Sequence, residues 1–214
     1  SIDNGVRTPT DTEYIKTRTA GREMLNLSPN DFLILGVGRL ENQKRPDRFR
    51  EMALKLHKKI PGSRVVWVGA GRLEDEWDAW VDTNRMKQVF TRTGWQRDVF
   101  PYLAAADIYI HPASYEGMPF SLLEAMAWQK CCVIMRELAN ELEYFTDENA
   151  IVADEGLDDW IDAANDVAER ARTAEDARQL VNDRFSLEHM AERYEAAYVK
   201  HIEACRTEVP EAGK

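Results

Sequence analysis

The chain has 214 residues, of which 28 are Lys or Arg and 38 are Asp or Glu, so its formal net charge is −10. This length fits one domain of ordinary size, and 44% hydrophobic residues exclude wholesale disorder. The acidic balance argues against nucleic-acid binding, because phosphate contacts need a basic surface. No apolar run approaches the ~20 residues that span a bilayer, and the first residues, SIDNGVRTPT, lack a signal-peptide pattern. We therefore expect a globular domain without a transmembrane segment.

Short apolar runs alternate along the chain with longer stretches of helical periodicity. The predicted strands span residues 32–37, 64–68, 88–91, 107–111, 131–135 and 150–153. Most are continuous apolar runs, which are typical of parallel strands buried on both faces. The predicted helices span residues 46–59, 73–84, 98–105, 119–129 and 138–145. This alternation predicts an α/β fold, a Rossmann-like doubly wound parallel sheet of about six strands.

The chain after residue 157 is predicted to be helical. Over residues 187–205 apolar side chains recur every three or four residues, which indicates an amphipathic helix. Its apolar stripe has two interpretations: it packs on the sheet of this domain, or it is exposed and contacts another domain. We expect residues 1–205 to form one domain. Residues 206–214 contain a Pro and no apolar period, and are predicted to be a disordered tail.

Cysteine and histidine positions give no sign of a disulfide framework or a metal site. Cys131 and Cys132 are adjacent within an apolar run and Cys205 stands alone, as expected of reduced thiols in the cytoplasm. The four histidines are scattered and lack the spacing of zinc ligands. We expect no bound metal.

Two predicted strands end in glycine loops, at Gly36-Val37-Gly38 and at Gly69-Ala70-Gly71. Each loop has Glu where a dinucleotide-binding loop has its third glycine, so the sequence does not support a nicotinamide dehydrogenase. Arg39 and Lys44 follow the first loop, and a guanidinium with an ammonium suits a diphosphate. The simpler interpretation is that both side chains are solvated cations without a ligand. Their position after a strand, where ligands of such sheets bind, favours the diphosphate.

Residues 111–127, HPASYEGMPFSLLEAMA, carry the most specific pattern. A strand ends where this segment begins, and a helix is expected to begin near Pro119. The free amides of residues 120–123 would then form the positive, anion-binding end of that helix. Glu116 and Glu124 lie on either side of this end. Two interpretations stay open: the carboxylates hold hydroxyl pairs of a ligand, or one decorates the loop and the other offsets the helix dipole.

Together these features resemble the retaining glycosyltransferases of family 4, which have the GT-B fold. The resemblance rests on NGV near the start, GVGRL-x4-K, a G-x-G after the second strand, a Gly-Trp turn, LAAADIYIHPASYEGMPFSLLEAMA and the closing RFSLEHMAERYEAAY. It covers residues 4–201 and corresponds to the carboxy-terminal, nucleotide-sugar-binding domain of that two-domain fold. The resemblance implies transfer of a sugar from a nucleoside-diphosphate sugar to a glycan or lipid acceptor. It also implies no metal or other cofactor, and a cytoplasmic setting in polysaccharide biosynthesis with membrane association of the full-length protein.

The resemblance further implies roles for individual residues. Arg39 and Lys44 neutralise the donor diphosphate and, with Glu116 against the transferred sugar, make up the catalytic set. Glu124 holds the ribose hydroxyls. The other implied donor contacts are Gly38, Gly94, Trp95, Gly117, Met118, Pro119, Phe120, Ser121, Leu122 and Leu123. For Trp95, next to the nucleobase by resemblance, a place in the core or at the rim of the domain is the competing interpretation.

The sequence departs from the family pattern at two places and lacks one whole part. Arg45 stands where the family usually has glycine, and the stretch RELANELEYFTDENAIV lacks the glycine pair of the family, with Glu141 as the candidate for its glutamate. Nothing here corresponds to the amino-terminal acceptor domain. We expect either an excised half or a donor domain that acts with a partner, and no transfer by the isolated chain. The alternatives are a sugar-nucleotide epimerase and a non-catalytic nucleotide-binding domain.

Overall fold

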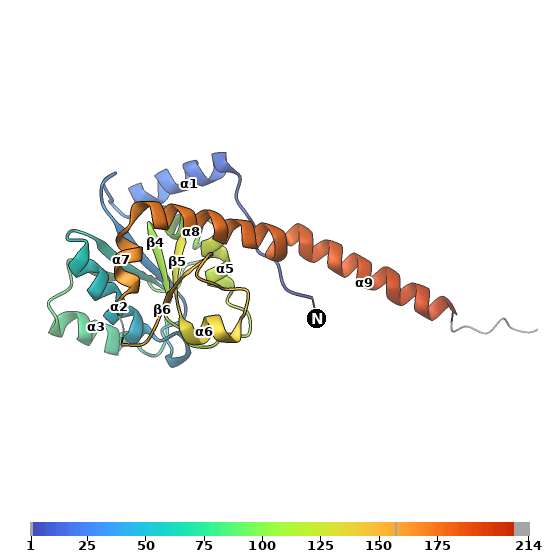
Figure 1. Cartoon of the computed structure of the whole chain (residues 1–214). Helices are drawn as coiled ribbons and strands as arrows, with labels where there is room; N and C mark the ends of the chain where they lie inside the picture. The colour runs from blue at the N-terminus through green and yellow to red at the C-terminus, as the bar shows by residue number, and fades with distance from the viewer. Residues whose placement is uncertain (1, 157, 208–214) are drawn as a thin grey trace, which may run out of the picture.

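The structure is a computed structural model that describes residues 2–156 and 158–207 (Figure 1). Six parallel strands form one sheet in the order β3-β2-β1-β4-β5-β6. The strands are β1 (Leu33–Val37), β2 (Arg64–Val68), β3 (Phe90–Arg92), β4 (Ile108–His111), β5 (Cys131–Met135) and β6 (Ile151–Ala153). Each predicted strand is present, and the predicted doubly wound α/β fold is confirmed.

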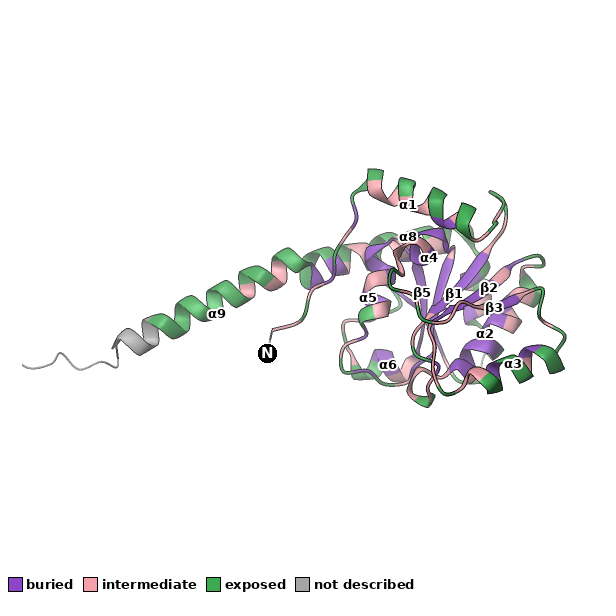
Figure 2. Ribbon diagram, turned by 180° about the vertical axis from the view of Figure 1, so that it is seen from behind, coloured by how far each residue is buried: buried purple, intermediate pink, exposed green. Residues whose placement is uncertain are grey.

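Both faces of the sheet are buried, which is why its strands are apolar without alternation (Figure 2). On β1, for example, Leu33 and Leu35 point into one half of the core and Ile34 into the other. One face is covered by α1 (Asp11–Met24), α4 (Phe100–Ala105), α5 (Phe120–Ala127), α6 (Arg136–Glu141) and α8 (Val167–Leu180). The other is covered by α2 (Pro46–Lys59), α3 (Glu74–Thr83) and α7 (Trp160–Asn165).

Two helices differ from the sequence-based expectation. The helix expected over residues 138–145 is α6, which begins directly after β5 and ends at Glu141. Its early start places Leu138 and Ala139 against the core. Helix α1 was not predicted: only its Gly21 is buried, so its apolar period is weak. The missed signal is its start, where the Thr10 side chain accepts a hydrogen bond from the Glu13 amide at 3.2 Å.

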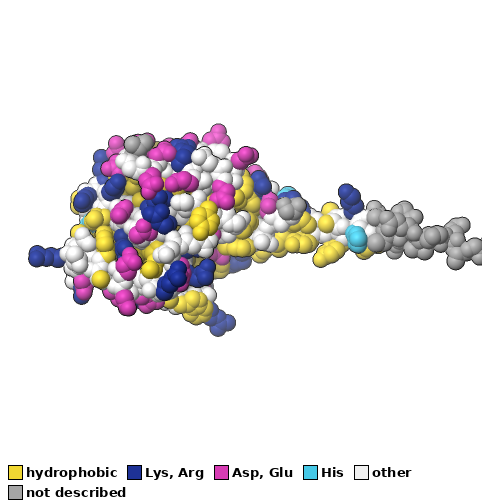
Figure 3. Space-filling view, turned by 90° about the horizontal axis from the view of Figure 1, so that it is seen from below, with side chains coloured by type: hydrophobic (Ala, Val, Ile, Leu, Met, Phe, Trp, Pro, Cys, Tyr) yellow, Lys and Arg dark blue, Asp and Glu magenta, His cyan; other side chains and the backbone are white. Residues whose placement is uncertain are grey.

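Helix α9 (Leu187–Thr207) follows the π-helical turn η2 (Val181–Phe185) and projects away from the body of the domain (Figures 1 and 2). Its apolar side chains are exposed along the projecting part (Figure 3): Tyr198 is 65% exposed and Ile202 51%. The interpretation in which this stripe packs on the domain's own sheet is therefore wrong. The helix runs to Thr207, into the segment expected to be disordered, and residues 208–214 lie outside the described residues.

The amino-terminal segment lies against the start of α9. Val6 forms a parallel bridge with Ser186, and the Gly5 amide lies 3.2 Å from the Met190 sulfur. The start of the chain and the start of α9 therefore meet at one corner of the domain.

The expectation of reduced thiols holds for the two described cysteines. Cys131 and Cys132 are free and buried, and burial raises the pKa of the Cys131 thiol to about 12. The Cys205 side chain lies outside the described part. In the part of the chain that the structure describes, no helix is both long and apolar enough to cross a membrane.

Candidate functional site

The order of the strands reverses between β1 and β4, which are neighbours in the middle of the sheet. The chain leaves β1 toward one side and β4 toward the other, so the segments that follow them diverge at the carboxyl edge. Such switch points are where open α/β sheets bind ligands. Residues 38–45 follow β1 and residues 112–119 follow β4, and these segments carry the cations and one of the carboxylates singled out by sequence.

An ion pair joins these two segments. Lys44, at the end of the short turn η1 (Asn42–Lys44), donates a hydrogen bond from its Nζ to the Glu116 carboxylate. Gly38 makes room for it, because a Cβ there would lie 3.2 Å from Lys44 Cγ. The side chain of Glu116 is 6% exposed. Burial alone raises the pKa of Glu116, but His111 and Lys44 outweigh burial and hold that pKa below its usual value. Glu116 is therefore ionised at neutral pH.

His111, the last residue of β4, completes this group and was not singled out as a site residue by sequence. Its Nε2 lies 3.6 Å from Glu116 Oε1, which is too long for a hydrogen bond. Among the described residues, this buried Nε2 has no hydrogen-bond partner. Burial lowers the pKa of His111, so its imidazole is neutral at pH 7. An unpaired ring nitrogen thus lies beside a buried carboxylate.

The second carboxylate lies in the helix that follows. Glu124 is half-buried in α5, and burial raises its pKa. Among the described residues no cation offsets this burial, in contrast to Glu116. The pKa values of the two carboxylates are therefore shifted in opposite directions, although Glu116 and Glu124 lie in one continuous segment of loop and helix.

The start of α5 corrects one expectation. Pro119 is the N-cap and the helix begins at Phe120. Three of the four amides expected to be free are engaged: the Phe120 amide donates to the Met118 carbonyl, and the Leu122 and Leu123 amides donate to the Pro119 carbonyl. The tight turn around Pro119 uses them locally, so the predicted four-amide anion site is wrong.

A buried tyrosine ties this helix start to β1. The Tyr109 hydroxyl lies 3.1 Å from Ser121 Oγ and 3.3 Å from the Val37 carbonyl oxygen. Burial raises the pKa of Tyr109, so it stays protonated. Sequence analysis missed this contact, because an apolar strand pattern does not show which tyrosine bonds across the sheet.

Three of the predicted site residues, Arg39, Gly94 and Trp95, lie outside this group. Arg39 is exposed, and its guanidinium pairs with none of the described residues. Trp95 is 73% exposed, which rules out the core interpretation for it. It follows Gly94, whose φ of 68° makes the turn and whose carbonyl accepts a hydrogen bond from the Gly69 amide at 2.9 Å.

The second glycine loop serves packing. A Cβ at Gly69 would lie 1.9 Å from the Gly38 carbonyl oxygen, and one at Gly71 would lie 2.4 Å from the Leu40 carbonyl oxygen. The loops after β1 and β2 therefore touch through backbone alone. Only glycine fits at these two positions, because any side chain would clash with the backbone of the neighbouring loop.

The two departures from the family pattern have structural counterparts. Arg45 has φ 47° and ψ 55°, the left-handed conformation that glycine adopts without strain. Its side chain pairs with Asp47 at 2.9 Å. Glu141 is exposed at the end of α6.

Within residues 2–156 and 158–207, no group of three or more His, Cys, Asp or Glu is placed to hold a metal ion.

Comparison with known proteins gives a family and two sequence relatives. The model of the family described as glycosyl transferases group 1 matches residues 31–170. The UDP-Gal:alpha-D-GlcNAc-diphosphoundecaprenol alpha-1,3-galactosyltransferase of Escherichia coli is 33% identical over 137 residues, 62% of this chain and 35% of that protein. An uncharacterized glycosyltransferase of Methanocaldococcus jannaschii is 20% identical over 106 residues, 50% of this chain and 26% of that protein. The chain thus spans about a third of the length of the curated relatives it matches.

Solved structures share the fold at low sequence identity. Anabaena HepE, in complex with UDP and glucose, has a TM-score of 0.75 at 18% identity and covers 92% of this chain and 56% of its own. WaaG, a glycosyltransferase involved in lipopolysaccharide biosynthesis, has a TM-score of 0.72 at 20% identity over 90% and 54%. Sucrose-phosphate synthase from Thermosynechococcus elongatus has a TM-score of 0.73 at 20% identity over 95% and 52%. In each case this chain corresponds to about half of the larger protein.

Proposed function

This chain belongs to the glycosyl transferases group 1 family, and we propose that it is the donor-binding half of a retaining glycosyltransferase. Such an enzyme moves a sugar from a nucleoside-diphosphate sugar to a glycan or lipid acceptor. The observation that carries the proposal is the buried Lys44–Glu116 pair at the switch point of the sheet, just before α5. The family assignment favours transfer over the epimerase alternative.

The cations at this edge are assigned to the diphosphate. The departing diphosphate gains negative charge in the transition state, and a fixed cation stabilises that charge more than it stabilises the bound substrate. Lys44 is held near α5 by Glu116, and Arg39, exposed on the same segment, is assigned as the second cation. The backbone donors assigned to the phosphates are the amides of Gly117, Met118 and Ser121. These charges do the work of a metal ion, so we propose that binding needs no metal.

The remaining assignments concern the sugar, the ribose and the base. Glu116 faces the transferred sugar, and Glu124 accepts hydrogen bonds from the ribose hydroxyls. Trp95 borders the nucleobase. We propose a UDP-sugar as donor, because the E. coli relative is named for UDP-Gal.

An acceptor domain outside these residues is part of the proposal. The chain covers 35% of the E. coli relative, whose name specifies a lipid-diphosphate acceptor. The exposed apolar side chains of α9, such as Tyr198, offer a surface for such a domain. We propose a cytoplasmic enzyme of polysaccharide or glycolipid synthesis that meets its acceptor at the membrane. The isolated chain is then inactive in transfer.

A thermal-shift panel of UDP, GDP, ADP, CDP and NAD tests the donor site, first without metal and then with magnesium. We expect a metal-independent rise of the melting temperature with UDP, because a ligand at 100 times its Kd adds about 2.7 kcal/mol of stability. Glu124→Ala should cut the shift at least by half, since a tenfold weaker Kd leaves about 1.4 kcal/mol, and Glu141→Ala, an exposed carboxylate on α6, should keep it. A shift that requires magnesium or is unchanged in Glu124→Ala contradicts the proposal. If the panel is flat, it is repeated with the amino-terminal half present, and a second flat result counts against any nucleotide site in this chain.

A further inference from the structure

Arg48 of α2 is a buried cation that the proposed donor contacts do not use. Its side chain is 8% exposed, and a buried guanidinium strongly destabilises a fold unless it is paired. Its partners lie on segments that follow three different strands: Ser114 Oγ at 3.0 Å, Glu155 Oε1 at 2.7 Å and Glu137 Oε1 at 3.7 Å. One side chain therefore connects the chain after β4, β5 and β6.

The contact with Ser114 bears on the proposed sugar site. Ser114 lies two residues before Glu116, in the segment between β4 and α5. Lys44, four residues before Arg48, holds the same segment through Glu116. Residues 44–48, from the end of η1 to the first turn of α2, therefore fix this segment at two points, once through each cation.

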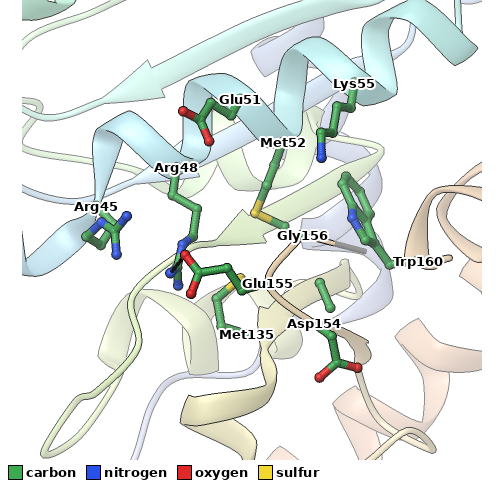
Figure 4. Close-up of a pocket in the computed structure, with 11 residues that line it drawn as sticks. Arg45, Arg48, Glu51, Met52, Lys55, Met135, Asp154, Glu155, Gly156 and Trp160 are labelled. Atoms are coloured by element: carbon green, nitrogen blue, oxygen red, sulfur yellow. Dashed lines mark hydrogen bonds and ion pairs between the residues drawn. The ribbon is translucent and has the colours of Figure 1, made fainter. Parts of the chain in front are cut away.

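Packing alone does not hold the neighbouring turn after β6. A cavity of about 70 Å³ lies between α2 and this turn, with Arg48 and Glu155 at its side (Figure 4). At Gly156, which lines it, no atom lies within 4 Å of an added Cβ. The Arg48–Glu155 pair spans this incompletely filled space.

We propose that Arg48 is a positioning residue that fixes the Glu116 segment through Ser114 and thereby sets the affinity for the donor. The inference rests on the donor site proposed above. Arg50 provides the contrast on the same helix. Its side chain is 5% exposed, pairs with Glu76 at 3.1 Å and lies 5.3 Å from the Trp80 ring, so it holds α3 and does not contact the Glu116 segment.

The test compares Arg48→Met, Ser114→Ala, their double variant and the matched control Arg50→Met. UDP affinity is measured by calorimetry, and amide hydrogen exchange is measured over residues 114–118. We expect Arg48→Met to weaken UDP binding at least tenfold and to speed exchange in this segment. Ser114→Ala should weaken binding less, and the double variant should bind no more weakly than Arg48→Met, because both changes break one hydrogen bond. Arg50→Met should change the affinity less than twofold.

Three results overturn the inference: unchanged affinity in Arg48→Met, an equal loss in Arg50→Met, or additive losses in the double variant. If Arg48→Met does not fold, Arg48→Lys replaces it, since lysine keeps the charge but cannot reach two partners with a planar fork. If the wild-type protein binds no nucleoside diphosphate, either alone or with its amino-terminal half present, the proposed donor site itself fails. Hydrogen exchange then decides the positioning role alone, and unchanged exchange over residues 114–118 in the Arg48 variant rejects it.

Discussion

Two charged clusters lie at opposite edges of the sheet, and they differ in how completely their atoms are bonded. The amino-edge cluster consists of Arg18, Arg22, Asp107 and Lys130, where the strands begin. Lys130, 2% exposed, donates to the carbonyls of Ala104 and Ala106 and to a tyrosine hydroxyl at 3.0 to 3.2 Å. Arg18 donates to three carbonyls at the end of α4 and to Asp107. Burial lowers the pKa of Lys130 to about 7, and its buried amine has three hydrogen-bond partners here.

The carboxyl-edge cluster consists of Lys44, His111, Glu116 and Glu124. Here His111 Nε2 is buried without a hydrogen bond to a described residue, and Glu124 is half-buried without a cation to lower its pKa. Buried polar groups cost free energy when they stay unpaired. The comparison teaches that the cations at the amino edge are bonded within the fold, whereas His111 and Glu124 at the carboxyl edge are not, as the proposed donor site requires.

The largest expected effect is on stability, at the amino edge. Arg22→Ala removes hydrogen bonds to the carbonyls of Ser28 and Asp31 and leaves Asp107 with one cation fewer. We expect a loss of about 3 kcal/mol in the free energy of unfolding, measured by urea denaturation. UDP affinity should be unchanged at temperatures where the variant is folded. A folded Arg22→Ala protein with weakened UDP binding contradicts the assignment of stability to the amino edge and ligand binding to the carboxyl edge.

Lys44→Ala should have the next largest effect, and on binding. Loss of one charge-assisted contact to a phosphate costs about 2 kcal/mol, or roughly 30-fold in Kd. Calorimetry with UDP measures it, and Lys55→Ala, an exposed lysine paired with Asp158, is the control. Equal Kd values for the two variants contradict the assignment of Lys44 to the diphosphate.

Glu124→Gln separates binding from stability. We expect about a tenfold weaker Kd for UDP, equal to ~1.4 kcal/mol, without loss of stability at pH 7, because the change removes a half-buried charge. The folded pKa of Glu124 lies above its unfolded value, so between the two values the folded chain binds more protons. Its contribution to stability therefore rises as pH falls through that window. Urea denaturation from pH 7 to pH 4 should show this rise in the wild type relative to Glu124→Gln, and parallel curves count against the raised pKa.

The smallest effect is expected for Arg45→Gly. Glycine removes the strain of a left-handed residue, about 1 kcal/mol, and loses a half-exposed pair with Asp47 and some chain entropy of similar size. The free energy of unfolding should change by less than about 1 kcal/mol, and UDP affinity should stay the same. A large loss of affinity shows that Arg45 itself contacts the donor.

The site residues that the sequence predicted are those whose place follows from the strand that precedes them. Lys44 and Glu116 follow neighbouring strands, so a parallel sheet brings them to one edge whatever their neighbours are. Arg48 and His111 escaped prediction because their roles depend on contacts across the fold, such as the one between Arg48 and Ser114, 66 residues apart in the chain. Whether the first amides of a helix are free also depends on local turns. This is why the amides after Pro119 were wrongly expected to be free.

The same holds for the fold: elements with a local sequence pattern were predicted, and an element held by a distant contact was missed. Strands buried on both faces, such as β5, show as short continuous apolar runs, and the predicted bounds of β5 are those observed. Helix α1 is missing from the prediction because it lies on top of α4 rather than in the core. Its Gly21 passes so close that an added Cβ would lie 2.1 Å from the Pro101 carbonyl oxygen. Such a contact depends on a distant partner and leaves no local period in the sequence.

The bridge between Val6 and Ser186 has a topological consequence. The first residues are bonded to the point where α9 leaves the body of the domain, so the body without α9 is a ring with one gap, and such rings tolerate the gap being moved. A circular permutant of this body, which joins residue 5 to residue 187 by a short linker and opens in the exposed turn after α3, near Arg85, should keep the same sheet.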